Sequence, residues 1–132
     1  MVKCAVMVNN ATRTSRVNMS LVNKYFQIAQ QIASKKDDRR QYRLGAVGVR
    51  SDGAMVMATN VPCQHPQRHA HAEARLTRKL DHGSSVFVVR VLKDGTMANA
   101  RPCDNCQKAM RGRGVKNCFY TISNLEYGVL VF

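Results

Sequence analysis

The sequence predicts one α/β domain in which a mixed β-sheet of about five strands is flanked by helices. Helical and strand patterns alternate along the chain after a β-hairpin, which favours a layered α/β domain. The chain has 132 residues, of which 45% are hydrophobic, enough to bury one core but not two. We therefore expect a single domain over residues 1–132, with residues 1–19 as an N-terminal extension whose structure the sequence does not define.

The first predicted element is an amphipathic helix that starts at Ser20, a suitable N-cap residue. After it, apolar residues recur at spacings of four, three and four, which is one face of a helix. These residues are Leu21, Tyr25, Ile28 and Ile32. We expect this face to pack on the sheet.

A β-hairpin is predicted next, over residues 43–50 and 53–60, because Asp52-Gly53 between two apolar runs is a strong turn signal. Residues 61–68 contain two prolines and are expected to be irregular. Near the N-terminus, the apolar residues 4–8 are a candidate for pairing at a sheet edge.

The later elements alternate between helix and strand. In order, they are a helix over residues 71–80, a strand over 85–92, a turn at 93–95, a helix over 103–113 and strands over 116–122 and 127–132. Pro102 suits the first turn of the second of these helices, and Gly112 and Gly114 suit its end.

The chain is strongly basic, with 21 Lys and Arg residues against 8 acids and a net charge of +13. Such an excess attracts polyanions such as nucleic acid, although a solubilising surface or a small phosphorylated substrate explains it equally well. Nine basic residues lie near the motifs described below: Arg68, Arg75, Arg78, Lys79, Arg101, Lys108, Arg111, Arg113 and Lys116.

The cysteines indicate a reducing compartment. Their number, five, is odd, and no signal peptide or membrane-spanning run is recognised, so reduced thiols or metal ligation are favoured over disulfides, and we expect a cytoplasmic protein. Only Cys103 and Cys106 have the spacing of metal ligands. Cys4 and Cys118 are interpreted as small apolar residues in or beside strands.

Two short motifs, "HAE" at 71–73 and "PCDNC" at 102–106, each open a predicted helix. The imidazole of His71 and the thiolates of Cys103 and Cys106 are ligand types that Zn²⁺ prefers. Three protein ligands leave one tetrahedral position for water, whose pKa zinc lowers toward neutrality. The carboxylate of Glu73 is then placed to move protons between that water, the substrate and a departing amine. By itself, each residue has a structural explanation, such as a helix start or an apolar helix face.

The combination H-x-E and P-C-x-x-C is the signature of the zinc nucleobase deaminases. The chain therefore resembles the cytidine and deoxycytidylate deaminase superfamily, from the helix near Ser20 to the strand at 119–122. This resemblance implies a three-layer fold, one catalytic zinc held by His71, Cys103 and Cys106, and Glu73 as the proton shuttle. It also implies that the amide of Ala72 contacts the base and that Asn60 lies near the sugar.

The leading substrate hypothesis from the sequence is cytosine within single-stranded DNA or RNA, held by a cationic track beside the base pocket. Few aromatic residues are available for base stacking; the candidates are Tyr120, Phe119 and Tyr42. The alternative is a free nucleotide or nucleoside such as dCMP, CMP or cytidine. A histidine as first ligand counts against a plain cytidine deaminase, because short free-cytidine enzymes of the superfamily usually carry cysteine there.

Other interpretations rank lower. A tRNA-type adenosine deaminase normally has a longer C-terminal region, and an inert nucleic-acid-binding module has no use for Glu73. A second zinc at Cys63, His65 and His69 fits no firm spacing, and an ordinary surface loop is favoured there. The apolar "GVLVF" at 128–132 is a candidate contact surface for a homo-oligomer.

Overall fold

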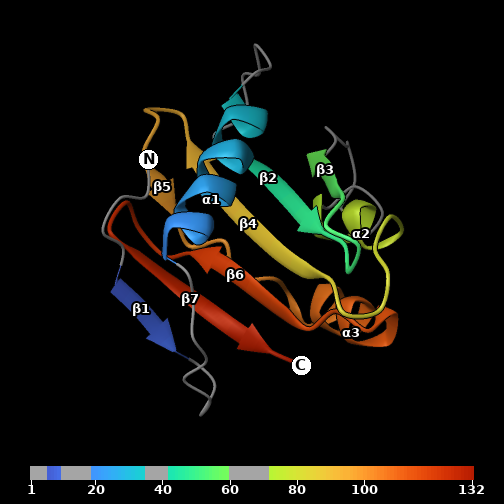
Figure 1. Cartoon of the computed structure of the whole chain (residues 1–132). Helices are drawn as coiled ribbons and strands as arrows, with labels where there is room; N and C mark the ends of the chain where they lie inside the picture. The colour runs from blue at the N-terminus through green and yellow to red at the C-terminus, as the bar shows by residue number, and fades with distance from the viewer. Residues whose placement is uncertain (1–5, 10–18, 35–41, 60–71) are drawn as a thin grey trace.

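A computed structural model describes residues 6–9, 19–34, 42–59 and 72–132 (Figure 1). Its elements are β1 (Val6–Asn9), α1 (Met19–Ser34), β2 (Tyr42–Val49), β3 (Met55–Thr59), α2 (Ala72–Thr77), β4 (Ser85–Leu92), β5 (Met97–Ala98), α3 (Asp104–Arg113), β6 (Asn117–Thr121) and β7 (Glu126–Val131). The predictions for residues 4–5, 60–68 and His69 lie outside the described residues.

The strands form one mixed sheet of seven strands in the order β1-β7-β6-β4-β2-β3, with β5 pairing β4. Strands β4 and β6 are parallel, as are β1 and β7, while β2 pairs antiparallel with both β3 and β4. The predicted mixed sheet is therefore confirmed, and its five long strands are those expected from the sequence. Strand β1 confirms, for residues 6–8, the predicted pairing of the N-terminal apolar run at a sheet edge, whereas β5, of two residues, is too short for a sequence pattern to define.

Helices cover both faces of the sheet, which gives the predicted three layers (Figure 1). Side chains of successive strand residues point to opposite faces. In β4, Phe87, Val89 and Val91 therefore join the core beneath α1. Val86 and Val88 join a second core, beneath α2 and α3. The two proposed motifs thus share one face of the sheet, opposite α1.

The predicted core-facing side of α1 is confirmed in part. Tyr25, Ile28 and Ile32 are partly buried and pack against the core, whereas Leu21 is 46% exposed. The residues that fill the core are Val22, Phe26, Ala29 and Ala33. Both sets are apolar at the same spacing, so periodicity cannot choose between them. The helix also begins at Met19, so Ser20 lies within its first turn and is not the N-cap.

Helix α3 begins at Asp104 with Cys103 as its N-cap, so Pro102 precedes the helix and does not occupy its first turn as predicted. Gly114 ends the helix with φ of 84°, a left-handed conformation that glycine adopts without strain. The apolar C-terminal segment forms β7, where Val129 and Leu130 are 5% and 8% exposed. Most of "GVLVF" is therefore internal and does not form the contact surface suggested by the sequence.

Asp81, just beyond α2, joins the end of that helix to the β2–β3 turn. Its carboxylate accepts hydrogen bonds from the hydroxyls of Ser84 and Ser51, at 2.6 and 2.7 Å, and from the Ser51 amide at 3.0 Å. These bonds, with Arg50 nearby, hold the pKa of Asp81 far below its usual range. The negative charge of Asp81 therefore helps to fix the position of α2.

Replacing Gly45 by alanine is expected to destabilise the protein by about 1–3 kcal/mol, because the new Cβ would overpack the contact between α1 and β2. That Cβ would lie 2.2 Å from the carbonyl oxygen of Ala29. Gly112→Ala is the control, since its Cβ meets nothing within 4 Å in α3. Urea denaturation measures both free energies of unfolding; equal stability of the two variants would contradict this packing.

Replacing Asp81 by asparagine is expected to lower the melting temperature near neutral pH. Because its folded pKa lies below the 3.8 of an ordinary aspartate, Asp81 contributes stability above pH 3.8, and this is lost as pH falls through the folded pKa. Melting curves should therefore converge for wild type and variant in acid. Asp52→Asn, in the exposed turn, is the control. A difference in melting temperature between wild type and Asp81→Asn that did not change with pH would show that the charge of Asp81 does not stabilise the fold.

Candidate zinc and substrate site

The two motifs lie at the starts of α2 and α3, as the sequence predicts. Ala72 and Glu73 are the first two residues of α2, so the carboxylate-bearing residue is fixed in the first turn of that helix. His71 immediately precedes the helix and lies outside the described residues, as does Asn60, which follows the last residue of β3. Their roles as ligand and sugar contact remain predictions.

Cys103 and Cys106 have the placement that a metal site requires. Cys103 is the exposed N-cap of α3, with an extended backbone, and Cys106 lies in the first turn with 3% of its surface exposed. A spacing of three residues at a helix start puts both sulfurs on the same side. The pair therefore combines one solvent-facing and one buried thiol at a single position in the fold.

Arginine side chains hold α2 in place relative to α3 and the sheet. Arg113, the last residue of α3, donates from Nε to the carbonyl of Leu80 at 2.9 Å and from Nη2 to that of Arg78 at 3.1 Å. Arg75 donates to the carbonyl of Thr59, at the end of β3, at 2.8 Å. The end of α3 is therefore bonded to the segment that follows α2, which ties the two motif helices together on one face of the sheet.

The segment that leads into Cys103 is also held by hydrogen bonds. The Ala100 amide donates to the carbonyl of Thr121 at 2.8 Å, and the Thr121 hydroxyl donates to the carbonyl of Ala98 at 2.9 Å. The side-chain amide of Gln107, in α3, donates to the carbonyl of Pro102 at 2.8 Å. Thr121 and Gln107 could not be identified from the sequence, since no local pattern marks a side chain that bonds to a backbone group elsewhere.

Two of the three aromatic residues proposed for base stacking, Phe119 and Tyr120, are in the protein core. Tyr120 is 3% exposed, and its ring covers Gly128, where an added Cβ would lie 2.4 Å from the ring. Phe119 is 6% exposed and stacks on Phe87, with ring centroids 4.7 Å apart, beneath α1 and away from the motif helices. Phe119 is therefore not a stacking platform for a base at the motifs. A substrate contact of Tyr120 stays a prediction, now from a buried starting position.

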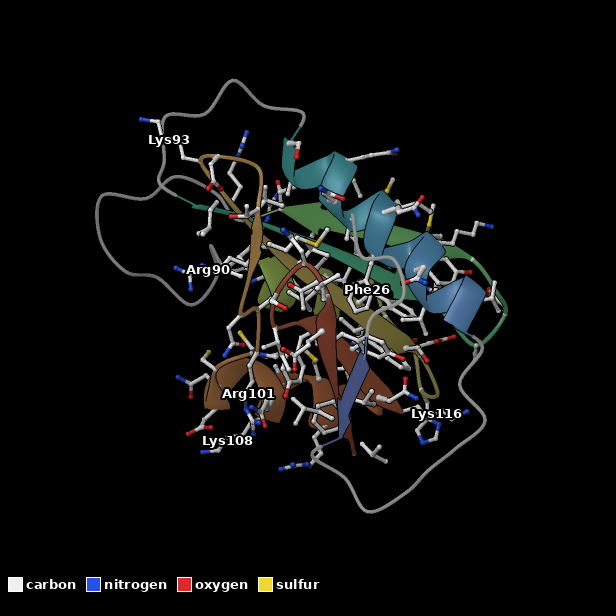
Figure 2. The ribbon with its side chains drawn as sticks, turned by 90° about the vertical axis from the view of Figure 1, so that its left-hand side faces the viewer. Phe26, Arg90, Lys93, Arg101, Lys108 and Lys116 are labelled. Carbon is white, nitrogen blue, oxygen red and sulfur yellow. The ribbon has the colours of Figure 1, made fainter. Side chains whose placement is uncertain are left out.

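Several basic residues near the motifs are used within the protein itself. Besides Arg75 and Arg113, Lys79 donates to the carbonyl of Met57 at 2.9 Å, and the Arg111 guanidinium lies 5.5 Å from the centre of the Phe132 ring. Arg101 and Lys108, in contrast, are exposed and lie together beside α3, while Lys116 lies elsewhere on the surface (Figure 2). The basic residues therefore do not form a single free track.

The two described donors, the thiols of Cys103 and Cys106, fit zinc. Among residues 6–9, 19–34, 42–59 and 72–132, no group of three or more His, Cys, Asp or Glu side chains is placed to hold a metal. The third expected ligand, His71, is outside these ranges. Two thiols at a helix start, together with the histidine that the sequence places just before α2, are the ligand types of a catalytic zinc site.

The sequence profile of the cytidine and deoxycytidylate deaminase zinc-binding region matches residues 19–122, which include both motifs. The chain belongs to this family of deaminases. It is a zinc-dependent hydrolytic deaminase, and its cofactor is Zn²⁺. No curated protein sequence is significantly similar to the chain.

A solved structure of a deaminase has the same fold. The cytidine deaminase from Burkholderia pseudomallei superposes with a TM-score of 0.60 at 18% identity, over 83% of this chain and 91% of that one. A point mutant of the cytidine deaminase from Mycobacterium tuberculosis gives a TM-score of 0.48 at 19% identity, over 75% and 83%. In the described part of this deaminase, no helix has both the length and the apolar composition needed to cross a membrane.

Cys106→Ser is expected to remove bound zinc and activity. Losing a ligand should weaken zinc binding by more than the roughly 10- to 100-fold that follows loss of a hydrogen bond to a ligand. Zinc per chain, measured by atomic emission after dialysis, should fall from one toward zero. Cys118→Ala is the matched control, because Cys118 is fully buried in β6. If Cys118→Ala lost zinc and Cys106→Ser kept it, the assignment of Cys106 as a zinc ligand would be wrong.

Proposed function

We propose that the protein deaminates cytosine in a free nucleoside or nucleotide, with water and the cytosine derivative giving the uracil derivative and ammonia. The observation that carries this choice is the internal use of the basic residues. Arg75, Lys79 and Arg113 donate to backbone carbonyls and Arg111 lies over an aromatic ring, so these cations make contacts within the fold as well as carrying charge. A small substrate needs no continuous cationic track.

The burial of Phe119 and Tyr120 supports the same choice, since binding of single-stranded nucleic acid normally uses exposed aromatic rings for stacking. The name of the Burkholderia pseudomallei protein, whose fold this chain shares, gives cytidine as its substrate, which is a free nucleoside.

Each site residue has a defined task in this reaction. Zn²⁺ held by His71, Cys103 and Cys106 would supply a Lewis acid that activates water near neutral pH. Glu73 takes one proton from water and delivers it to the N3 atom of the base; it then takes the second water-derived proton, from the hydroxyl on C4, and delivers it to N4 as the C4–N4 bond breaks and ammonia leaves. The amide of Ala72 holds the base carbonyl and Asn60 the sugar, so that C4 faces the water.

Cytosine within single-stranded nucleic acid is the second candidate, and the net charge of +13 is the observation that favours it. Its binding should weaken steeply with salt, whereas the KM of a mononucleotide should change far less.

A cytoplasmic location is also part of our proposal, because the ligand thiols must stay reduced. So is a homo-oligomer, which size-exclusion chromatography with light scattering would detect.

The decisive assay follows ammonia release and conversion of cytosine to uracil by the zinc-loaded protein. The substrates are deoxycytidine, cytidine, dCMP, CMP and a single-stranded oligodeoxynucleotide. We expect turnover on the free compounds and none on the oligonucleotide. Glu73→Gln should lower kcat by about 10²- to 10⁴-fold.

Glu126→Gln, in an exposed position at the start of β7, is the control for removal of a carboxylate. Turnover confined to the oligonucleotide, with a steep salt dependence, would overturn the proposal in favour of the second candidate. Bound zinc without turnover on any of these substrates would leave only a non-catalytic binding role.

A further inference from the structure

We propose that Gln107 is a positioning residue that fixes the direction in which Cys103 presents its sulfur to zinc. This inference rests on the proposed function, because it concerns the same zinc site, and it adds a residue that lies outside both motifs. Gln107 follows the proposed ligand Cys106 in the first half of α3. From there it makes hydrogen bonds to the peptide groups on both sides of Cys103.

The two hydrogen bonds of Gln107 differ in what they require from the residue. Its backbone amide donates to the carbonyl of Cys103 at 2.9 Å, which is the ordinary bond between residues four apart in a helix. Any residue except proline makes this bond. Its side-chain Nε2 donates to the carbonyl of Pro102 at 2.8 Å, and this second bond needs a donor at the end of a side chain of this length.

The peptide group before Cys103 needs this support because Cys103 stands at the boundary of the helix. As the N-cap of α3 it has an extended backbone, with φ of −66° and ψ of 165°. A serine or aspartate at such a position fixes itself by a hydrogen bond from its own side chain to the first turn. Cys103 makes no side-chain cap bond of this kind, and the bond from Gln107 to Pro102 fixes its backbone instead.

Holding both neighbouring peptide groups determines where the sulfur of Cys103 points. Because peptide groups are planar, fixing the plane before Cys103 and the plane after it fixes both of its backbone torsions. The direction of its Cα–Cβ bond follows from these torsions. The side chain of Gln107 therefore acts on the ligand through the backbone, without touching the metal.

The chain that leads to Cys103 is itself anchored, so Gln107 acts on a held segment. Thr121 is fully buried at the end of β6, and its hydroxyl donates to the carbonyl of Ala98 at 2.9 Å. The carbonyl of Thr121 accepts a bond from the Ala100 amide at 2.8 Å. Only two residues, one of them a proline with its fixed φ, lie between Ala100 and Cys103. The bond from Gln107 thus completes the path of fixed groups from the sheet to the ligand.

Of the two proposed thiol ligands, Cys103 is the one that depends on such support. Cys106 lies within α3 and is 3% exposed, in the core beneath α2 and α3, so the helix and the packing both hold it. Cys103 is exposed at the end of the helix. A zinc site requires each sulfur at about 2.3 Å from the metal in a tetrahedral direction. Groups that orient a ligand typically change metal affinity or activity by about 10- to 100-fold when they are removed.

Gln107→Leu and Gln107→Glu test this role. Leucine is at least as good a helix former as glutamine but donates no hydrogen bond, and an ionised glutamate keeps the shape but only accepts. We expect both variants to bind zinc about 10-fold more weakly than wild type, measured by competition with a chromophoric chelator. Ala109→Leu and Ala109→Glu place the same side chains at an exposed position of α3 and should bind zinc as wild type does.

Cobalt in place of zinc gives a readout of ligand geometry that does not depend on turnover. The visible ligand-field bands of Co²⁺ report the arrangement of its ligands, and the charge-transfer bands from thiolate to cobalt report the sulfurs. Both sets of bands should change in Gln107→Leu and Gln107→Glu. The spectra of the two Ala109 variants should superpose on that of wild type.

The possible outcomes separate this inference from the proposed function. If Gln107→Leu had the zinc affinity and cobalt spectrum of wild type and only a lower melting temperature, Gln107 would stabilise the helix start without positioning Cys103. Equal loss of zinc from the Ala109 variants would also contradict the inference. If the zinc and cobalt results were as expected but wild type turned over no free cytosine compound, the proposed function alone would fail. A wild type that bound no zinc would overturn both.

Discussion

Burial of β4 on both faces is the constraint on which the rest of the structure depends. The strand lies inside the sheet, paired with β2, β5 and β6, and its alternate side chains enter two separate cores. Phe87 and Val89 anchor α1, whereas Val86 and Val88 support the layer of α2 and α3. A strand that is buried on both faces needs apolar residues at successive positions, and the β4 sequence "SVFVVRVL" meets this requirement. The deaminase site is thus built on a central strand that cannot shift without opening both layers.

The type and order of the main elements could be predicted from the sequence because they follow from local patterns. Asp52-Gly53 fixed the hairpin, and the β-branched run fixed β4, with bounds identical to those of the structure. Which face of α1 is most deeply buried could not be predicted. Apolar residues occupy two adjacent faces of the helix, and only the packing against the sheet decides which of them is central. For the same reason β1, whose partner β7 lies at the other end of the chain, had no decisive local signal.

For the site, sequence motifs identified the residues that carry chemistry but not those that hold them. Cys103 and Cys106 stand out because thiols at this spacing are rare, and both lie at the start of α3 as expected. Thr121 and Gln107 do not, because hydroxyl and amide side chains occur everywhere and become informative only when the fold shows what they bond. Net charge is the least specific signal, because composition counts cations, whereas the fold shows which of them also make contacts within the protein.

Cations of α2 and of the turn that follows it also determine how the sheet ends. Among the described residues β3 is the last strand on its side, and the carbonyls of Met57 and Thr59, two residues apart, accept bonds from Lys79 and Arg75. An uncovered strand edge is a template for pairing with another chain. Here, long side chains occupy two of the acceptors that an incoming strand would need, so this margin of the sheet is a poor template for further strands.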